Sequence, residues 1–159
     1  MAIDFDKTMI DIHTGGVWNG TSQELLSHVR PMFAQLLQAA MERNMWMAVV
    51  TFSPQIELIS TILTHLVGRL SLHKIPIRGG HSSQWRYAGM GSQDGKQGHM
   101  ASAVEELEQR FHADITKRST VLLDDDAKNV RIALRNGVRA VWFNPKQPEL
   151  IWKELQEML

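Results

Sequence analysis

Two carboxylates stand one residue apart near the start of the sequence, in the stretch DFDKT at residues 4–8. On an extended strand, residues two apart point to the same face, so Asp4 and Asp6 would repel each other there. Like charges about 4 Å apart repel by about 4 kcal/mol at an effective dielectric constant of 20. A bound cation would remove this penalty. Oxygen ligands in a chain without cysteine favour a hard ion such as Mg²⁺.

Further polar side chains stand where later apolar runs end. Thr51 follows VV at 49–50, and Asp124 and Asp125 follow VLL at 121–123. Lys96 comes just before a segment of helical periodicity. Ligands of parallel α/β sheets bind outside the carboxyl ends of the strands, so we expect these groups and the DFDKT pair in one crevice. Taken alone, the DDD at 124–126 is explained as well by a helix cap, and only the combination favours a site.

The elements that must position these residues are short apolar runs alternating with segments of helical period. This alternation is typical of βαβ units. We therefore expect an α/β fold with a mostly parallel sheet and helices on both faces. The expected strands are 1–4, 46–51, 74–77, 120–123 and 140–143.

The helical segments carry start and stop signals. A capping box of Thr21 and Glu24 opens the first, and Pro31 restarts it because proline is tolerated in a first helical turn. The later helices are expected at 56–66, at 100–111, from 127 to a stop at Gly137, and at 148–158.

The one long irregular stretch is the glycine-rich loop at 79–95. Loops of this length are usually functional or disordered. Trp85, Arg86 and Tyr87 within it would stack on or clamp a substrate group. Alternatively, the aromatic pair pins the loop to the body of the protein, and the sequence leaves both interpretations open.

The composition narrows the class of protein. The 159 residues suit one domain over 1–159 with a core of its own. Lysine plus arginine equal aspartate plus glutamate at 17 each, so no net charge draws the chain to nucleic acid or an acidic membrane. Cysteine is absent, the start does not look like a signal peptide, and no stretch approaches the ~20 apolar residues of a membrane span. We therefore expect a cytoplasmic protein, with homo-oligomers compatible with the sequence.

Four segments, in order, resemble the motifs of the haloacid dehalogenase superfamily of phosphatases. They are DFDKT at 4–8, VVT at 49–51, Lys96 and LLDDDAKN at 122–129. The resemblance spans nearly the whole chain, and the order separates it from response-regulator receivers, whose lysine follows the acidic pair. It implies a Rossmann-like three-layer sandwich without a large cap domain, and it is nearest to small uncapped members such as the magnesium-dependent phosphatases.

The resemblance also implies roles for single residues. Asp4 would attack phosphorus and become an aspartyl phosphate, while Asp6 would protonate the leaving oxygen and later deprotonate the attacking water. Thr51 would hold a phosphate oxygen, and Lys96 would neutralise the nucleophile and the phosphoryl group. The full set implied to contact the phosphorylated substrate is Thr8, Thr51, Phe52, Lys96 and Arg86.

Mg²⁺ is the implied cofactor. Its ligands would be Asp4, Asp6 through its backbone carbonyl, Asp124 and Asp125, with Asn129 orienting them. An uncapped site implies a bulky substrate such as a phosphoprotein. Two other functions stay open at this point: a non-catalytic phosphate-binding or regulatory domain, which would not need the acid–base group of Asp6, and a phosphotransferase.

Overall fold

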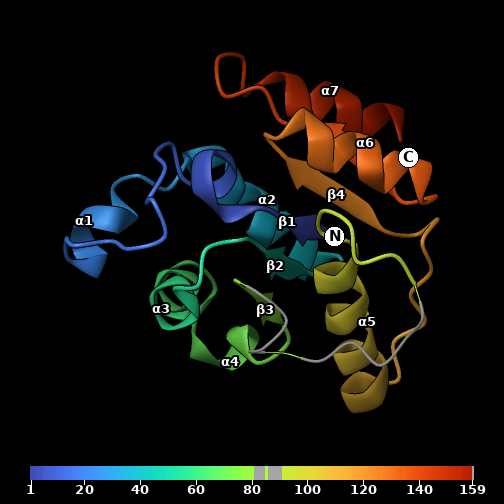
Figure 1. The fold of residues 1–159 in the computed structure, drawn as a ribbon. Helices are drawn as coiled ribbons and strands as arrows, with labels where there is room; N and C mark the ends of the chain where they lie inside the picture. Colours follow the sequence, from blue (N-terminus) through green and yellow to red (C-terminus); the bar gives the residue numbers. More distant parts are fainter. Residues whose placement is uncertain (81–84, 86–90, 159) are drawn as a thin grey trace.

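Five short strands form one parallel sheet in the computed structural model, which describes residues 1–80, 85 and 91–158. They are β1 (Ala2–Ile3), β2 (Ala48–Val50), β3 (Ile77–Arg78), β4 (Val121–Asp124) and β5 (Arg139–Trp142). Their order across the sheet is β3-β2-β1-β4-β5, which puts β1 at the centre (Figure 1). The residue that follows β1 therefore meets the carboxyl ends of β2 and β4.

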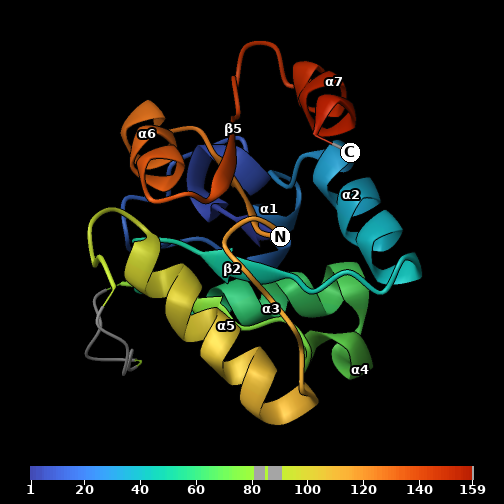
Figure 2. The same ribbon diagram turned by 90° about the vertical axis from the view of Figure 1, so that its right-hand side faces the viewer.

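Helices cover both faces of this sheet, as the sequence predicts. Within the described part of the chain they are α1 (Ser22–Leu26), α2 (Pro31–Glu42), α3 (Ile56–Val67), α4 (Arg69–Leu72), α5 (Gln97–Phe111), α6 (Ala127–Arg135) and α7 (Leu150–Glu157). Figure 2 shows α5 and α6 on one side of the strands and α2 and α7 on the other. The arrangement is a Rossmann-like α/β fold. No helix of the described ranges combines the length and apolar character that crossing a bilayer requires.

Alternate residues of each strand feed two separate cores, because successive side chains of a strand point to opposite faces. Ile3 joins the larger core beneath α2, α3 and α7, whereas its neighbour Ala2 joins the smaller core beneath α5 and α6. The larger core also takes Val49, Leu123, Val141, Phe33, Leu37, Ile59 and Ile151, and the smaller takes Ala48, Val50, Leu122, Ala140, Met100 and Ala133. Both faces of the sheet are therefore buried.

Most predicted elements are present, with differences at their ends. The predicted strand at 74–77 was wrong in its placement: β3 begins at Ile77, because the amides of Lys74 and Ile75 close turns onto Ser71 and Leu72, and Pro76 has no amide to donate. The short helix α4 was not predicted. It follows Gly68, whose φ of 78° ends α3.

A wide helical turn, η1 (Phe5–Met9), follows β1 and was not predicted either. The turn is closed by two backbone hydrogen bonds, from Met9 N to Asp4 O over 3.3 Å and from Ile10 N to Phe5 O over 3.1 Å. Lys7 lies in the left-handed region at φ 60°. The guanidinium of Arg30 donates to the carbonyl of Thr8 over 3.1 Å and fixes the turn from outside. The turn thereby ends the strand at Asp4.

Candidate functional site

A cleft of about 540 Å³ opens at the carboxyl ends of the central strands. Three of its walls come from remote parts of the chain: η1, the turn from β2 to α3, and the turn from β4 to α6. Its lining comprises Asp4, Asp6, Lys7, His13, Gly15, Gly16, Thr51, Phe52, Ser53, Lys96, Asp124, Asp125, Asp126 and Asn129. The groups that the strand-end rule predicts in one crevice therefore all line this cleft: Asp4, Asp6, Thr51, Asp124 and Asp125.

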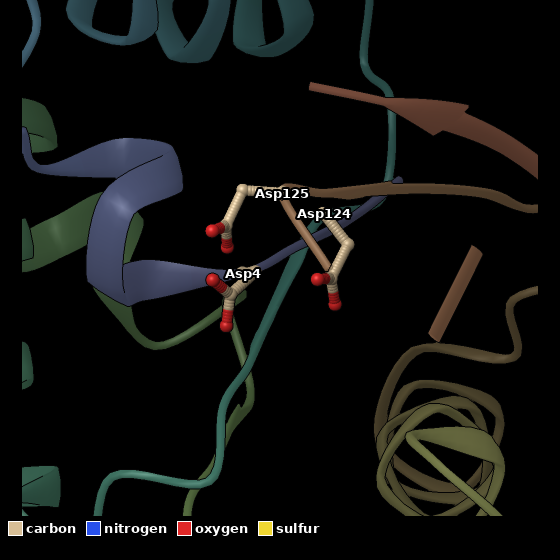
Figure 3. Close-up of side chains that lie close together, drawn as sticks. All are labelled: Asp4, Asp124 and Asp125. Atoms are coloured by element: carbon tan, nitrogen blue, oxygen red, sulfur yellow. The ribbon is translucent and has the colours of Figure 1, made fainter. Parts of the chain in front are cut away.

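Three carboxylates meet at the floor of this cleft. Each of Asp4, Asp124 and Asp125 offers an oxygen within 4.8 Å of those of the other two. Figure 3 shows that they come from the adjacent ends of β1 and β4. Asp4 and Asp124 are buried, and Asp125 is half-buried. This is the one group of acidic or histidine residues within the described ranges that could hold a metal ion.

Lys96 supplies the counter-charge at the floor. It stands just before α5, with only 2% of its surface exposed, and its ammonium forms ion pairs with Asp4 and, at 2.9 Å, with Asp124. Burial opposes a charge on Lys96, but the two carboxylates outweigh it and raise the pKa of the ammonium. Lys96 is therefore held as a cation.

The three acids together carry more negative charge than Lys96 can neutralise. Burial raises the pKa of Asp4, of Asp124 and of Asp125 above the usual carboxyl range, against the opposing pull of Lys96. Repulsion among the acids adds to the rise: Asp125 acts on Asp4, and Asp124 acts on Asp125. Lys96 neutralises one of the three charges, so the group carries an excess of two, which a divalent cation would balance. Oxygen donors at this spacing fit a hard ion.

The DDD run divides into two kinds of residue. Asp126 caps α6, accepting from Lys128 N over 2.7 Å, so the helix-cap interpretation holds for this residue. Asp124 faces the cleft and is oriented by Asp126 N at 2.8 Å and by the side-chain amide of Asn129 at 3.1 Å. Asn129 thus contacts the acid that the sequence expected it to orient.

Asp125 is held by groups on two other elements. Its amide donates to the hydroxyl of Thr8 over 3.0 Å, and that hydroxyl lies 3.3 Å from its carboxylate. The indole of Trp142, on β5, donates to its carbonyl over 2.7 Å. Thr8 is fully buried and outside the cleft lining, so its predicted phosphate contact stays a prediction while its observed partner is Asp125. The role of Trp142 has no signal in the sequence.

Thr51 and Phe52 form the wall after β2. Thr51 is buried, and its hydroxyl oxygen accepts from Ser53 N over 3.1 Å, so the hydroxyl hydrogen is left to donate. Phe52 is 51% exposed at the cleft, and the Lys96 ammonium lies 5.5 Å from the centre of its ring. Both residues line the cleft, and their predicted contact with a phosphate group stays a prediction.

Asp6 is separate from the three clustered acids. The hydroxyl of Thr14 lies 3.0 Å from each of its carboxylate oxygens, Thr14 N donates to it over 3.3 Å, and Nδ1 of His13 lies 3.1 Å away. Its side chain therefore projects to the wall at residues 13–18 and not to the floor. The predicted contact of its backbone carbonyl with a metal stays a prediction. Thr14 and His13 were not expected in the site.

Of the loop residues singled out in the sequence, Arg86 and Tyr87 lie outside the described residues. Trp85 is buried, donates its indole N–H to Gly79 O over 3.1 Å and packs on His99 with ring centres 4.5 Å apart. For Trp85, these contacts favour the interpretation of an aromatic residue that pins the loop to the body.

Comparison with known proteins adds no relative. No family model matches the chain, and no curated protein matches it at a significant level. What the site can do must therefore be argued from its own residues.

Proposed function

We propose that this chain is a Mg²⁺-dependent phosphatase of the haloacid dehalogenase type, which hydrolyses a phosphomonoester through an aspartyl phosphate. One observation carries the proposal: Lys96, Thr51 and the three clustered acids, which come from separate segments of the chain, line one cleft. A nucleophilic carboxylate beside an ammonium and a hydroxyl donor is an arrangement suited to phosphoryl transfer.

The metal would be held by Asp4, Asp124 and Asp125, whose oxygens lie close enough together to share one ion. When bound, Mg²⁺ would balance the excess charge of these acids and stabilise negative charge on the transferring phosphoryl group. Asn129 and Asp126 N keep Asp124 turned toward this position. Asp6 is proposed to contribute its backbone carbonyl, since its side chain is bound to Thr14.

In the first step, an oxygen of Asp4 attacks phosphorus, and the bond from phosphorus to the leaving oxygen breaks. The leaving oxygen takes a proton from the Asp6 carboxyl. In the second step, water attacks the aspartyl phosphate and gives a proton to Asp6, while the bond from phosphorus to the Asp4 oxygen breaks and phosphate departs. Acid–base assistance of this kind contributes about 10² to 10⁴ in rate.

The phosphoryl oxygens would be held by two cleft groups. The Thr51 hydroxyl has a free hydrogen because its oxygen accepts from Ser53 N. Lys96 contacts Asp4 and lies at the same floor, so it would lower the charge on both nucleophile and phosphate. Between η1 and α2, the described residues form one loop and the short α1, so we propose a substrate larger than a sugar phosphate, such as a phosphoprotein.

The test is phosphate release from p-nitrophenyl phosphate by wild type and Asp4→Asn, with Mg²⁺ and with a chelator. We expect turnover only for wild type with Mg²⁺. Asp114→Asn is the matched control, since it makes the same change on an exposed residue at the other end of the sheet. Turnover by Asp4→Asn would remove Asp4 from its role. A silent wild type would favour a non-catalytic phosphate-binding domain, and phosphate transfer to an added alcohol would indicate a phosphotransferase.

A further inference from the structure

Gln55 stands at the start of α3, yet its side chain does not cap that helix. Its amide nitrogen donates instead to the hydroxyl of Thr14 over 3.1 Å and to the hydroxyl of Ser53 over 3.1 Å. Its amide oxygen accepts from the backbone N–H of Trp18. The side chain of Gln55 thus forms hydrogen bonds to the loop at 13–18 and to the turn after β2.

These contacts fix which way the amide faces. A backbone N–H only donates, so the group that meets Trp18 N must be the oxygen of Gln55. The nitrogen must then face Thr14 and occupy an acceptor site on its hydroxyl. The single hydrogen of that hydroxyl is consequently directed to Asp6, 3.0 Å away. A chain of hydrogen bonds therefore runs from Trp18 through Gln55 and Thr14 to Asp6.

The loop that carries Thr14 is fixed at its far end by Trp18, which packs against the larger core and donates its indole N–H to Thr21 O over 2.9 Å. Between these two residues, Gly15 and Gly16, with φ of 68° and 83°, bring no side chain. Val17 is 68% exposed, so it adds almost no apolar burial. The position of the Asp6 carboxylate consequently depends on polar anchors, and Gln55 binds the loop at both Thr14 and Trp18.

We infer that Gln55 is a positioning residue, which holds the loop at 13–18 so that Thr14 keeps the Asp6 carboxyl directed at the leaving oxygen of the substrate. This inference rests on the proposed phosphatase function, and Gln55 itself touches no reacting atom. Loss of Gln55 leaves the nucleophile, the metal ligands and Lys96 in place. It therefore affects the step that needs a proton, and not phosphoryl transfer in general.

Substrates with different leaving groups distinguish a defect in proton donation from a general defect in phosphoryl transfer. p-Nitrophenol departs readily without a proton, whereas phenol needs one, so kcat/KM on phenyl phosphate reports the position of Asp6 more strongly. For Gln55→Ala we expect the loss on phenyl phosphate to exceed the loss on p-nitrophenyl phosphate by about tenfold, within the ~10² to 10⁴ that an acid contributes. Gln38→Ala, on the exposed face of α2, is the control and should alter neither value.

Two further variants separate anchoring from positioning. Gln55→Glu keeps an oxygen for Trp18 N but has no donor for Thr14, so it should show the leaving-group effect while the Trp18 amide stays protected from hydrogen exchange. Gln55→Ala should show the leaving-group effect and should also lose the protection of the Trp18 amide. Thr14 is the next residue in the chain of hydrogen bonds. Thr14→Val should show the same leaving-group effect, whereas Thr14→Ser should behave nearly as wild type, because serine keeps the hydroxyl.

Each outcome bears on a different statement. Equal losses of Gln55→Ala on both substrates, or none, overturn the positioning role while the phosphatase function stands. Unchanged exchange of the Trp18 amide in Gln55→Ala overturns the anchoring, and this NMR measurement does not depend on activity. A wild type that releases no phosphate from either substrate overturns the proposed function together with the positioning role.

Discussion

Asp125→Asn should stabilise the metal-free protein and abolish much of its response to Mg²⁺. The substitution removes one charge from the floor of the cleft without changing the shape of the side chain. An asparagine oxygen can still accept from the Thr8 hydroxyl, and the backbone N–H that donates to Thr8 is unchanged. Electrostatics therefore dominates the effect of this substitution.

The magnitude follows from the separation of the carboxylates. Two unit charges 4.8 Å apart repel by about 3.5 kcal/mol at an effective dielectric constant of 20. Asp125 faces two such neighbours, Asp4 and Asp124, while Lys96 and Lys7 pull in the opposite direction. Asp125 is only half-buried, so water screens part of each of these charge–charge interactions. We therefore expect a net gain of about 1 to 3 kcal/mol in the free energy of unfolding.

The assay is urea unfolding at pH 7.5, first with a chelator and then with Mg²⁺ at matched ionic strength. A ligand at 100 times its dissociation constant stabilises by about 2.7 kcal/mol, and wild type should approach this gain. Asp125→Asn should have a higher free energy of unfolding than wild type in the presence of the chelator, and Mg²⁺ should raise it far less. Asp114→Asn should behave as wild type in both conditions. If Asp125→Asn is the less stable protein in chelator, or responds to Mg²⁺ as fully as wild type, the reasoning about excess charge is refuted.

Three further changes test other parts of the structure by urea unfolding. Lys96→Met leaves two buried carboxylates without their cation, so it should lower the free energy of unfolding by about 3 to 5 kcal/mol at neutral pH in the presence of a chelator. The same change at the exposed Lys117 should leave the free energy of unfolding nearly unchanged. Burial opposes ionisation of Glu106, but hydrogen bonds from arginines, Arg78 at 2.6 Å among them, lower its pKa. The stability that Glu106 contributes is present above its unfolded-state pKa and is lost as the pH falls through its folded-state pKa, so the deficit of Glu106→Gln at pH 7 should shrink as the pH is lowered below 4.5. Arg30→Ala removes a donor to the carbonyls of η1 and should cost about 1 to 3 kcal/mol, with no change in the Mg²⁺ response.

The sequence predicted the parts of the molecule that follow from local pattern. Alternating apolar runs and helical periods predict the α/β class, and the rule about strand ends predicts that Asp4, Asp124 and Asp125 lie together. Lys96 was placed in the same site by its order among the motifs. The predictions of the α/β class and of the three clustered acids succeed because they depend on local patterns and on a general property of parallel sheets.

What the sequence did not predict depends on contacts between remote segments. Gln55 and Thr14 are 41 residues apart and meet through one hydrogen bond, which leaves no trace in either segment. Trp142 stands in the strand predicted at 140–143, but nothing in the sequence indicates that its half-exposed side chain contacts the Asp125 carbonyl. The left-handed Lys7 was also unforeseen, since no glycine marks the turn there.

The charge at the cleft floor links the fold to the proposed chemistry. Lys96 enters from the start of α5, and it contacts acids at the ends of β1 and β4, so its ion pairs form only when these three segments are packed together. They satisfy one charge of three and leave burial to raise the pKa of each acid. Burial and mutual repulsion of these acids therefore lower the free energy of unfolding at neutral pH, and under the proposed function a bound divalent cation would offset this loss. Under the proposed function, the acids that would take part in the reaction are the same acids whose excess charge a bound metal ion would balance.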